Sequence, residues 1–282
     1  MAKSLSAIEK EVSCPSIVFK VRHGYYSINS TNISSIMRLP EYQTIPNAPD
    51  SITGIFLYRG ASIPMLDMRT VFGVPSLQDE YKEFSAMLEA RKQDHINWVD
   101  TLNRSVEQNE KFTLATDPHK CAFGKWYDSY KPESHIIAHH MRKIDEPHRK
   151  LHQAALDIEE CNKECHNCDR EECLKSVMDR AEKEYMPMVL SLLDEAIILF
   201  RSEVYHEMVL ILGNQEEQQI GIVVDEVLSV EDLNKISDNH QLEQFQRNGY
   251  ITGVASSQRI PGMILELDEK KILQFVGALE IN

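Results

Sequence analysis

The sequence has no long hydrophobic run. Its longest apolar stretches, such as MVLIL and AIILF, are far shorter than the roughly 18 to 20 residues of a membrane-spanning helix. The first residues, MAKSLSAIEKEV, become charged and helical in pattern and lack the apolar region of a secretion signal. We therefore expect a cytoplasmic protein that does not insert directly into a membrane.

The sequence also lacks any stretch rich in Lys and Arg with interleaved aromatic residues. Its 44 acidic residues outnumber 30 Lys and Arg residues, which gives a formal net charge of -14 at pH 7. This charge opposes binding to phosphate backbones. Nucleic acid is therefore not an expected partner.

Cysteine is scarce outside the middle of the chain, because five of the six cysteines fall between residues 121 and 173. In a reducing compartment, such a set indicates thiols or metal ligands rather than a framework of disulfides. The chemistry of these cysteines is therefore expected in the central part of the chain.

Two outer segments, 14–76 and 204–282, show short alternating runs separated by Gly and Pro, a pattern typical of β-strands. They share a repeat: ITGIFLYRGASIPMLD at 52–67 returns as ITGVASSQRIPGMILELD at 251–268. Each copy ends on an Asp that is a candidate N-cap for a short helix. Repeated short strands predict two small related β-barrels rather than one open sheet.

The central segment, 77–203, has a helical pattern. Apolar seam positions recur every three or four residues within 84–106, within 137–158, and again from Leu174 to Met188 and Leu192. A short helix near 118–130 makes the fourth, so we predict an antiparallel four-helix bundle. An even number of helices returns the chain to its starting end, which lets the bundle be inserted into another domain. The fold class is multidomain α+β.

Three histidines fall at or beside the bundle seams. His95 lies on the first seam, and His148 and His152 are four residues apart on the next, where two imidazoles face the same side of a helix. Cys121, on the short helix, is a candidate fourth ligand, and three imidazoles with one thiolate suit tetrahedral Zn²⁺. Spacing alone leaves open the alternative of polar core residues that satisfy one another.

The motifs around these residues resemble a known family. HINW at 95–98, CAFGKW at 121–126 and HRKLH at 148–152 are similar to the three motifs of the chemoreceptor zinc-binding (CZB) domain. The resemblance covers about residues 80 to 200. It implies one zinc ion held by His95, Cys121, His148 and His152. We expect Trp98 and Trp126 to shield this site from water.

The outer segments resemble the CheW-type chemotaxis coupling domain. The similar stretches are NAPDSITGIFLYRGASIPMLDMRTVFG at 47–73, GIVVDEVLSV at 221–230 and YITGVASSQRIPGMILELD at 250–268. The resemblance implies two SH3-like barrels, with the first half of the domain at 14–76, the insertion at 77–203 and the second half at 204–282.

This second resemblance also implies partners: methyl-accepting chemoreceptors and a CheA-type histidine kinase, at receptor arrays. Arg59 and Gly60 match a receptor-facing Arg-Gly pair of the family, and Ile33 matches another receptor contact. Leu57 stands where the family has Asn. The zinc-domain resemblance adds a homodimer through the bundle as a further partner.

A second cysteine cluster, CNKECHNCDREEC, contains Cys161, Cys165, Cys168 and Cys173. Neither resemblance calls for it. Four thiols within thirteen residues suit a second Zn²⁺, an iron-sulfur cluster or reversible disulfides. The remaining alternative is that these cysteines lie in a loop and have no metal-binding or redox function.

These observations lead to one main hypothesis and two alternatives. The main hypothesis is a non-enzymatic chemotaxis scaffold whose bundle senses zinc, or an oxidant such as hypochlorite, through Cys121. The first alternative is a module for a kinase outside motility, with purely structural zinc. The second, a zinc hydrolase, is disfavoured because four protein ligands leave no open position and the sequence has no His-Glu-x-x-His motif.

Overall fold

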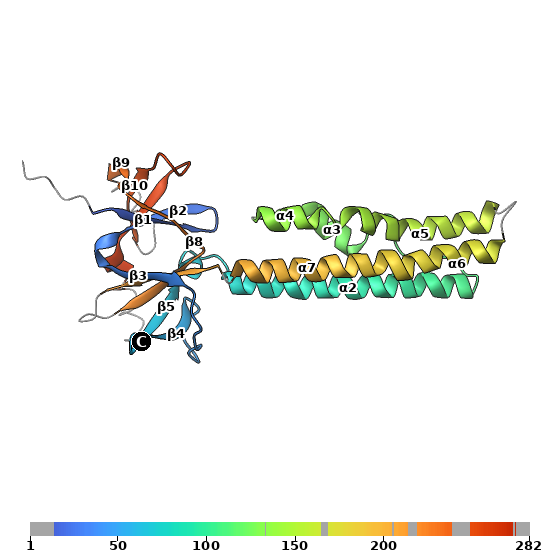
Figure 1. The fold of residues 1–282 in the computed structure, drawn as a ribbon, viewed down its shortest axis with the longest axis horizontal. Coiled ribbons are helices and arrows are strands. Elements are labelled where there is room, and N and C mark those ends of the chain that lie inside the picture. The colour runs from blue at the N-terminus through green and yellow to red at the C-terminus, as the bar shows by residue number, and fades with distance from the viewer. Residues whose placement is uncertain are drawn as a thin grey trace, which may run out of the picture. The chain divides into compact units, whose positions relative to one another are not determined.

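The computed structural model of the chain describes residues 14–132, 134–164, 169–204, 206–213, 219–238, 249–272 and 274. The chain divides into two compact units, shown in Figure 1. A sheet unit takes the chain up to residue 77 and again from residue 205, and a helical unit takes residues 78–204 between them. The helical unit is therefore inserted into the sheet unit.

The described residues of the sheet unit form two sheets. The first has the strand order β8–β1–β2–β11–β10–β9, with bounds β1 (Ser16–Val21), β2 (Gly24–Asn29), β8 (Glu226–Glu231), β9 (Asn234–Asp238), β10 (Ile251–Ser256) and β11 (Ile264–Leu267). The second has the order β3–β6–β7–β5–β4, with bounds β3 (Ile33–Arg38), β4 (Ile52–Tyr58), β5 (Ala61–Asp67), β6 (Met208–Leu212) and β7 (Ile220–Val224).

Both sheets combine strands from before and after the insertion. In the first sheet β1 pairs with β8 and β2 with β11, and in the second β3 pairs with β6 and β5 with β7. Among the described strands neither order closes on itself, so the expected closed barrels are not found. The spacing of strands along the chain carries no information on closure, since closure depends on pairing between strands far apart in sequence.

The sequence repeat adopts the same local structure twice. Hairpins β4–β5 and β10–β11 each have a bulge at the Thr of the ITG motif, between Ile52 and Gly54 in one and between Ile251 and Gly253 in the other. Each hairpin also lies beside a parallel strand, β7 or β2. At the end of each copy the Asp carboxylate accepts a backbone N–H two residues on, at 2.8 and 2.9 Å, so both predicted N-caps are confirmed.

The described residues of the helical unit form three long helical segments and two short helices. Their bounds are α2 (Leu77–Glu107), α3 (Ala122–Ser129), α4 (His135–Met141), α5 (Asp145–Glu164), α6 (Arg170–Arg180), the π-helix η2 (Ala181–Tyr185) and α7 (Met186–Val204). The segments α6, η2 and α7 follow one another without a break. The unit therefore differs from a simple four-helix bundle, because a turn at 142–144 separates α4 from α5.

The predicted seam positions from 137 to 158 face the core despite that turn. Ile137 and Met141 on α4, Ile144 in the turn, and Leu151 and Ile158 on α5 are all buried. The first seam also holds on α2, where Phe84, Leu88, Trp98 and Leu102 are buried. Apolar burial against neighbouring helices therefore stabilises these segments, as the pattern indicates.

The third seam changes phase at the π-helix. Before it, Leu174 and Met178 are buried as predicted, but Met188 beyond it is 48% exposed. There Val189 and Leu193 are buried instead, one residue later than expected. A π-turn contains one residue more than an α-turn, so it rotates the helix that follows. The prediction of Met188 as a seam position is therefore wrong.

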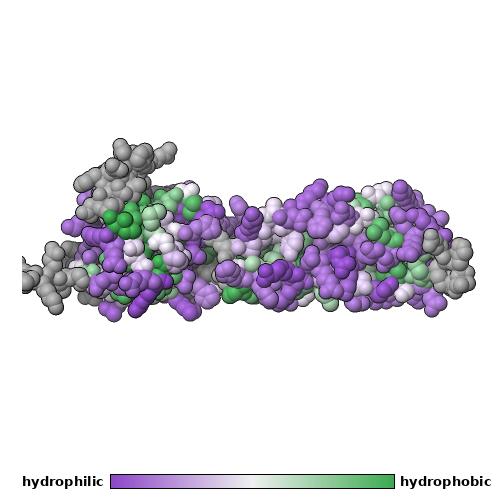
Figure 2. Space-filling model, turned by 90° about the horizontal axis from the view of Figure 1, so that it is seen from above, coloured by the Kyte–Doolittle hydropathy of each residue, from purple (hydrophilic) through white to green (hydrophobic). Residues whose placement is uncertain are grey.

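The surface of the helical unit is consistent with this internal seam. The face seen in Figure 2 is mostly hydrophilic, with hydrophobic residues scattered over it. Among the described helices, none is both long and apolar enough to cross a membrane.

Candidate metal centre

Four side chains from three helical elements meet in the helical unit. His95 comes from α2, His148 and His152 from α5, and Cys121 from the N-cap position of α3. One ligand atom from each lies within 4.8 Å of all the others, and the three histidines are buried. The structure therefore places together the four residues that the sequence motifs singled out.

Two of the histidines are oriented by backbone carbonyls. His95 Nδ1 lies 2.7 Å from the carbonyl oxygen of Arg91, and His152 Nδ1 lies 3.0 Å from that of Ala115. A carbonyl only accepts, so each Nδ1 carries the proton and each Nε2 presents a lone pair. These two Nε2 atoms are buried and have no hydrogen-bond partner among the described residues.

Cys121 is fixed by the turn that starts α3. Its Sγ accepts the N–H of Gly124 at 3.1 Å and lies 3.2 Å from the carbonyl oxygen of Pro118. A Cβ at Gly124 would meet that same Pro118 oxygen at 1.9 Å. The glycine of the CAFGKW motif is thus required by the close approach of α3 to the turn before it. Cys121 Sγ also lies 3.4 Å from His148 Nε2.

Aromatic rings enclose the histidines. Phe123 is 1% exposed, and its ring centroid lies 5.0 Å from that of His148 and 5.8 Å from that of His95. The ring centroid of Trp98 lies 4.8 Å from that of His152. The rings recorded beside Trp126 are instead Phe84, Phe123 and Tyr130. Trp98 therefore shields the site as expected, but its partner in this role is Phe123, with Trp126 packed behind it.

Burial sets the protonation of these groups in the metal-free protein. Loss of solvation, together with the neighbouring histidines, lowers the pKa of His148 to about 2, and burial lowers the pKa of His152 to about 4. Both imidazoles are therefore neutral at pH 7, which is the form that binds metals. Burial raises the pKa of the Cys121 thiol, against the opposing effect of the Gly124 N–H.

The residues fit a zinc ion. Bonds of about 2.1 Å to nitrogen and 2.3 Å to sulfur place tetrahedral ligand atoms about 3.6 Å apart. The observed 3.4 Å between Cys121 Sγ and His148 Nε2 is close to that separation. Two buried, unpartnered imidazole nitrogens aimed into the same space are costly unless a cation fills it.

The cysteine-rich loop is not supported as a second metal site. Cys161 on α5 and Cys173 on α6 form a disulfide with each other, with their Cα atoms 6.1 Å apart. Their sulfurs are therefore not available as thiolate ligands in this structure. Cys165 and Cys168 lie outside the described residues.

The predicted receptor contacts lie at different places in the second sheet. Arg59 and Gly60 form the β4–β5 turn, both with positive φ, and the Arg59 guanidinium lies 5.1 Å from the Tyr58 ring centre. Ile33 begins β3, at the opposite edge of the sheet from β4. Leu57 beside the turn is 75% exposed. The structure thus does not bring Ile33 and Arg59 together on one strand pair.

Sequence reasoning missed a second buried polar cluster, made by Asp67, Arg69, Glu207 and Asp225 in the sheet unit. Arg69 donates through Nε and Nη2 to the two oxygens of Asp225, at 2.7 and 2.8 Å. Glu207, 2% exposed, has its pKa raised to about 8, chiefly by burial and then by the nearby carboxylates of Asp67 and Asp225. The signal in the sequence is an acid directly beside an apolar run, Glu207 in HEMVLIL and Asp225 in IVVDEV.

Comparison with known families agrees with the motifs. A CheW-like domain matches residues 15–116, and the chemoreceptor zinc-binding domain matches residues 95–159, a range that contains all four clustered residues. The two matches overlap at 95–116, which the structure places in the helical unit. Both resemblances seen in the sequence motifs are thereby confirmed.

Among solved structures, the chain is similar to the scaffolding protein TtCheW from Thermoanaerobacter tengcongensis. The identity is 10%, the match covers 94% of this chain and 91% of that chain, and the TM-score is 0.40. No curated protein matches the chain.

Proposed function

We propose that this chain, which joins a CheW-like domain to an inserted chemoreceptor zinc-binding domain, is a non-enzymatic scaffold in chemotaxis. It would link methyl-accepting chemoreceptors to a CheA-type histidine kinase in the cytoplasm, at receptor arrays. Its helical unit would hold one zinc ion through His95, Cys121, His148 and His152. The two domain matches support the first part of this proposal, and the geometry of the four side chains supports the second.

The observation that carries the zinc proposal is the pair of buried Nε2 atoms on His95 and His152. Each imidazole has its Nδ1–H paired to a carbonyl, so the remaining nitrogen accepts only from a donor or binds a cation. An alternative cluster of polar core residues would satisfy its members through one another. These two atoms are not satisfied in this way among the described residues.

Cys121 is the group through which the site would respond to an oxidant. A zinc ion held by the four residues would keep the Cys121 sulfur as a thiolate, which is the reactive form. With hypochlorous acid, the thiolate gains the oxygen to give a sulfenic acid and chloride is released. The sulfur is then a poorer ligand, and the start of α3 loses its tie to α2 and α5.

The chain enters the helical unit at residue 78 and leaves it at residue 204, so α2 begins and α7 ends where the chain passes between the two units. A change in how α3 and α5 hold α2 would therefore reach the sheet unit along the chain. This link rests on connectivity, and the test below measures its output directly.

Metal content tests the site. We expect one zinc per chain in the purified protein, and its loss in Cys121→Ser and His152→Ala. Cys14→Ser is the matched control, because Cys14 is an exposed free cysteine outside the helical unit. Zinc that is retained in full by both site variants would rule out the proposed ligands.

Kinase activity in a reconstituted complex with receptor tests the sensor. We expect chelator and hypochlorite each to change the activity of the kinase, and Cys121→Ser to remove the response to hypochlorite. If activity ignores both treatments while the complex still assembles, the zinc is structural and the scaffold remains. If the protein binds neither receptor nor kinase, the partner should be sought by pull-down from native cells. Recovery of a kinase that does not act in motility would support the alternative function.

The β4–β5 turn is the proposed receptor contact. Arg59→Ala should weaken receptor binding without unfolding the protein, because the side chain lies at a turn. Lys82→Ala is a control, since it removes an exposed cation on α2, outside the sheet unit. Equal receptor binding by Arg59→Ala and the parent would remove Arg59 from the contact.

A further inference from the structure

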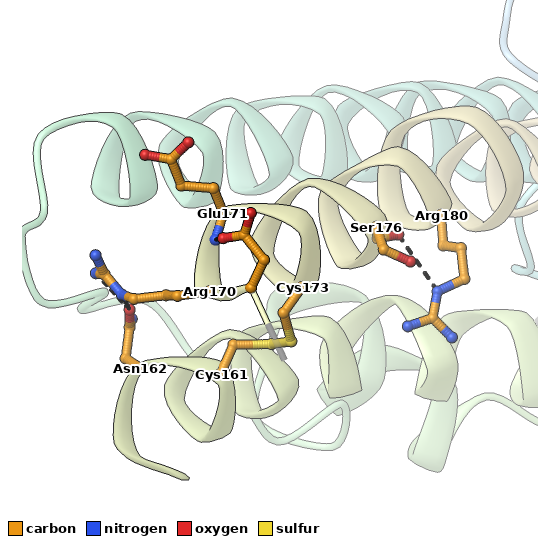
Figure 3. The surroundings of a disulfide bond; sticks show 8 residues. Cys161, Asn162, Arg170, Glu171, Cys173, Ser176 and Arg180 are labelled. Carbon is orange, nitrogen blue, oxygen red and sulfur yellow. Dashed lines mark hydrogen bonds between the residues drawn. A yellow bond between two sulfur atoms is a disulfide. The ribbon is translucent and has the colours of Figure 1, made fainter. Parts of the chain in front are cut away.

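The tip of the helical unit carries a disulfide that the zinc centre does not use. Cys161 lies in the last turns of α5 and Cys173 in the first turns of α6, twelve residues later. Figure 3 shows the two side chains pointing toward one another across the gap between these helices. The Cα–Cα distance of 6.1 Å falls within the usual range for a disulfide, so the bond needs no movement of the backbone.

The surroundings of the two sulfurs suit both the linked and the reduced form. Cys161 is buried in the apolar core of the unit, and Cys173 is partly buried against the same core. A free cysteine packs as a small hydrophobic residue, so reduction leaves both side chains in favourable surroundings. Cys173 is the more exposed of the two and is therefore the sulfur that a reagent in solvent reaches first.

A polar clamp holds the tip independently of the sulfur atoms. Arg170, at the start of α6, donates to Asn162 Oδ1 from Nε at 2.9 Å and from Nη2 at 2.6 Å. The same Nη2 lies 2.9 Å from Asn109 Oδ1, just past the end of α2. Figure 3 shows Arg170 and Asn162 beside the disulfide. This clamp would keep the ends of α5 and α6 together when the disulfide is open.

The helix that carries Cys161 also carries His148 and His152, and the helix that carries Cys173 continues through η2 into α7. The disulfide therefore ties the metal-ligand helix to the segment that leads back to the sheet unit. Without this tie, the polar clamp and the apolar packing of α5 against α6 would still hold the two helices together, but less firmly.

We propose that Cys161 and Cys173 form a reversible dithiol–disulfide pair, a second redox site separate from Cys121. The oxidant is a peroxide. The Cys173 thiol loses its proton, the thiolate attacks one peroxide oxygen, the O–O bond breaks, and a sulfenic acid and hydroxide form; the hydroxide takes up that proton to give water. The Cys161 thiol then attacks that sulfur, the S–O bond breaks, and a second water leaves. In all, two thiols lose two electrons and two protons, and hydrogen peroxide becomes two waters. A small dithiol reverses the step by exchange.

This proposal goes beyond the zinc function and does not rest on it. The test uses the full-length zinc-loaded protein, reduced with dithiothreitol, freed of reductant without air and treated with stoichiometric hydrogen peroxide. Alkylation with N-ethylmaleimide and peptide mass spectrometry then report each cysteine, and elemental analysis reports zinc.

We expect peroxide to link Cys161 to Cys173, dithiothreitol to release both thiols in the folded protein, and zinc to stay bound through the cycle. Cys161→Ser should abolish the link, while Cys14→Ser, which changes an exposed free cysteine outside the helical unit, should form it as fast as the parent. Amides at the end of α5 should exchange with deuterium at least about tenfold more slowly in the linked form.

Four results would overturn the proposal. These are thiols that stay unlinked in peroxide, a bond that dithiothreitol opens only on unfolding, linkage to Cys165 or Cys168 in place of the described pair, and a peroxide-formed link that persists in Cys161→Ser. Failure of zinc binding alone would overturn the zinc function and leave this pair intact.

A variant of the clamp tests the geometry without touching sulfur. Arg170→Ala should slow formation of the disulfide about threefold, which is the scale of an exposed polar contact. Lys175→Ala, on an exposed position of α6, should not change the rate. Equal rates in the parent and Arg170→Ala would remove the clamp from the proposal.

Discussion

The helical unit and the sheet unit each bury a cluster of four titratable side chains, and the two clusters differ in how their charges are compensated. In the sheet unit, the guanidinium of Arg69 faces three carboxyl groups, and it makes a bidentate pair with Asp225. In the helical unit, three histidines whose pKa values are lowered by burial face one thiol.

The difference is visible in individual atoms. Asp67 accepts the backbone N–H of Arg69 at 2.8 Å, and Asp225 accepts that of Arg22 at 2.7 Å. By contrast, Nε2 of His95 and of His152 have no partner among the described residues. A cluster that contains its own cation, as the sheet cluster contains Arg69, has part of its negative charge compensated from within, whereas lone pairs directed at a common point are suited to an ion from outside.

Metal removal should therefore affect one unit and spare the other, and this is the largest effect that we expect. At free zinc a thousandfold above its dissociation constant, binding stabilises the folded helical unit by about 4 kcal/mol. A chelator should lower the free energy of unfolding of the helical unit by that amount, and so lower its transition temperature. The transition temperature of the sheet unit should not change, as followed by circular dichroism. His95→Ala is the control, because its helical transition should ignore zinc. If the chelator destabilised only the sheet unit, the sheet cluster and not the helical cluster would be the one that depends on a metal ion.

Removal of the internal cation should have the opposite selectivity. Arg69→Met leaves Asp225 without its guanidinium partner and should destabilise the sheet unit by about 3 kcal/mol, measured by denaturant unfolding. We expect the low end of the range for a broken buried pair, because Asp225 keeps the Arg22 N–H. Zinc affinity should be unchanged. Lys82→Met, which removes an exposed pair with Asp79, should change stability by less than about 1 kcal/mol. A similarly small loss in Arg69→Met would show that the cluster contributes little.

The sheet cluster should also respond to pH. Burial raises the pKa of Glu207 from 4.5 to about 8, so the folded state holds a proton that the unfolded state has lost. The stability that this bound proton contributes is complete below pH 4.5 and is lost as pH rises through 8. The free energy of unfolding therefore falls with rising pH. Between pH 6.5 and 8.5 the sheet unit should lose about 2 kcal/mol. Glu207→Gln should flatten that profile, and a slope that persists in this variant would assign it to another group.

The sequence predicted the helical unit better than the sheet unit, for a physical reason. A helical seam is a local pattern, so burial of Leu88 on α2 and of Leu151 on α5 followed from spacing alone. The seam failed at Met188, where a π-turn adds one residue, a local event with no mark in the apolar pattern. Sheet pairing is set by contacts between distant segments, and the mixing of strands across the insertion was therefore not predictable from spacing.

The two polar clusters also differ in how far the sequence could predict them. Cys121, His148 and His152 stand in motifs with helical or turn spacing, so their approach to His95 could be expected, although their role as ligands stays a prediction. Arg69 and Glu207 are separated by the whole helical unit, and each alone looks like an ordinary surface residue. Their burial depends on how β6 and α1 (Met68–Val71) meet in the folded sheet unit.

The smallest effect that we predict concerns how the helical cluster is held. The indole N–H of Trp98 donates to the carbonyl oxygen of Ala115 at 2.9 Å, and this is the oxygen that orients His152. Trp98→Phe keeps a ring against His152 but removes that donor. It should cost about 1 kcal/mol of stability and weaken zinc binding by less than about tenfold, because the indole acts through a carbonyl and not on the ligand itself.

Trp126→Phe is the matched control for Trp98→Phe, since its ring neighbours are Phe84, Phe123 and Tyr130. It should lower stability and leave zinc affinity unchanged, as measured by competition with a zinc-binding dye. Equal zinc affinities in the two variants would mean that the indole N–H of Trp98 does not act on zinc binding through the Ala115 carbonyl, whose own hydrogen bond to His152 neither variant removes.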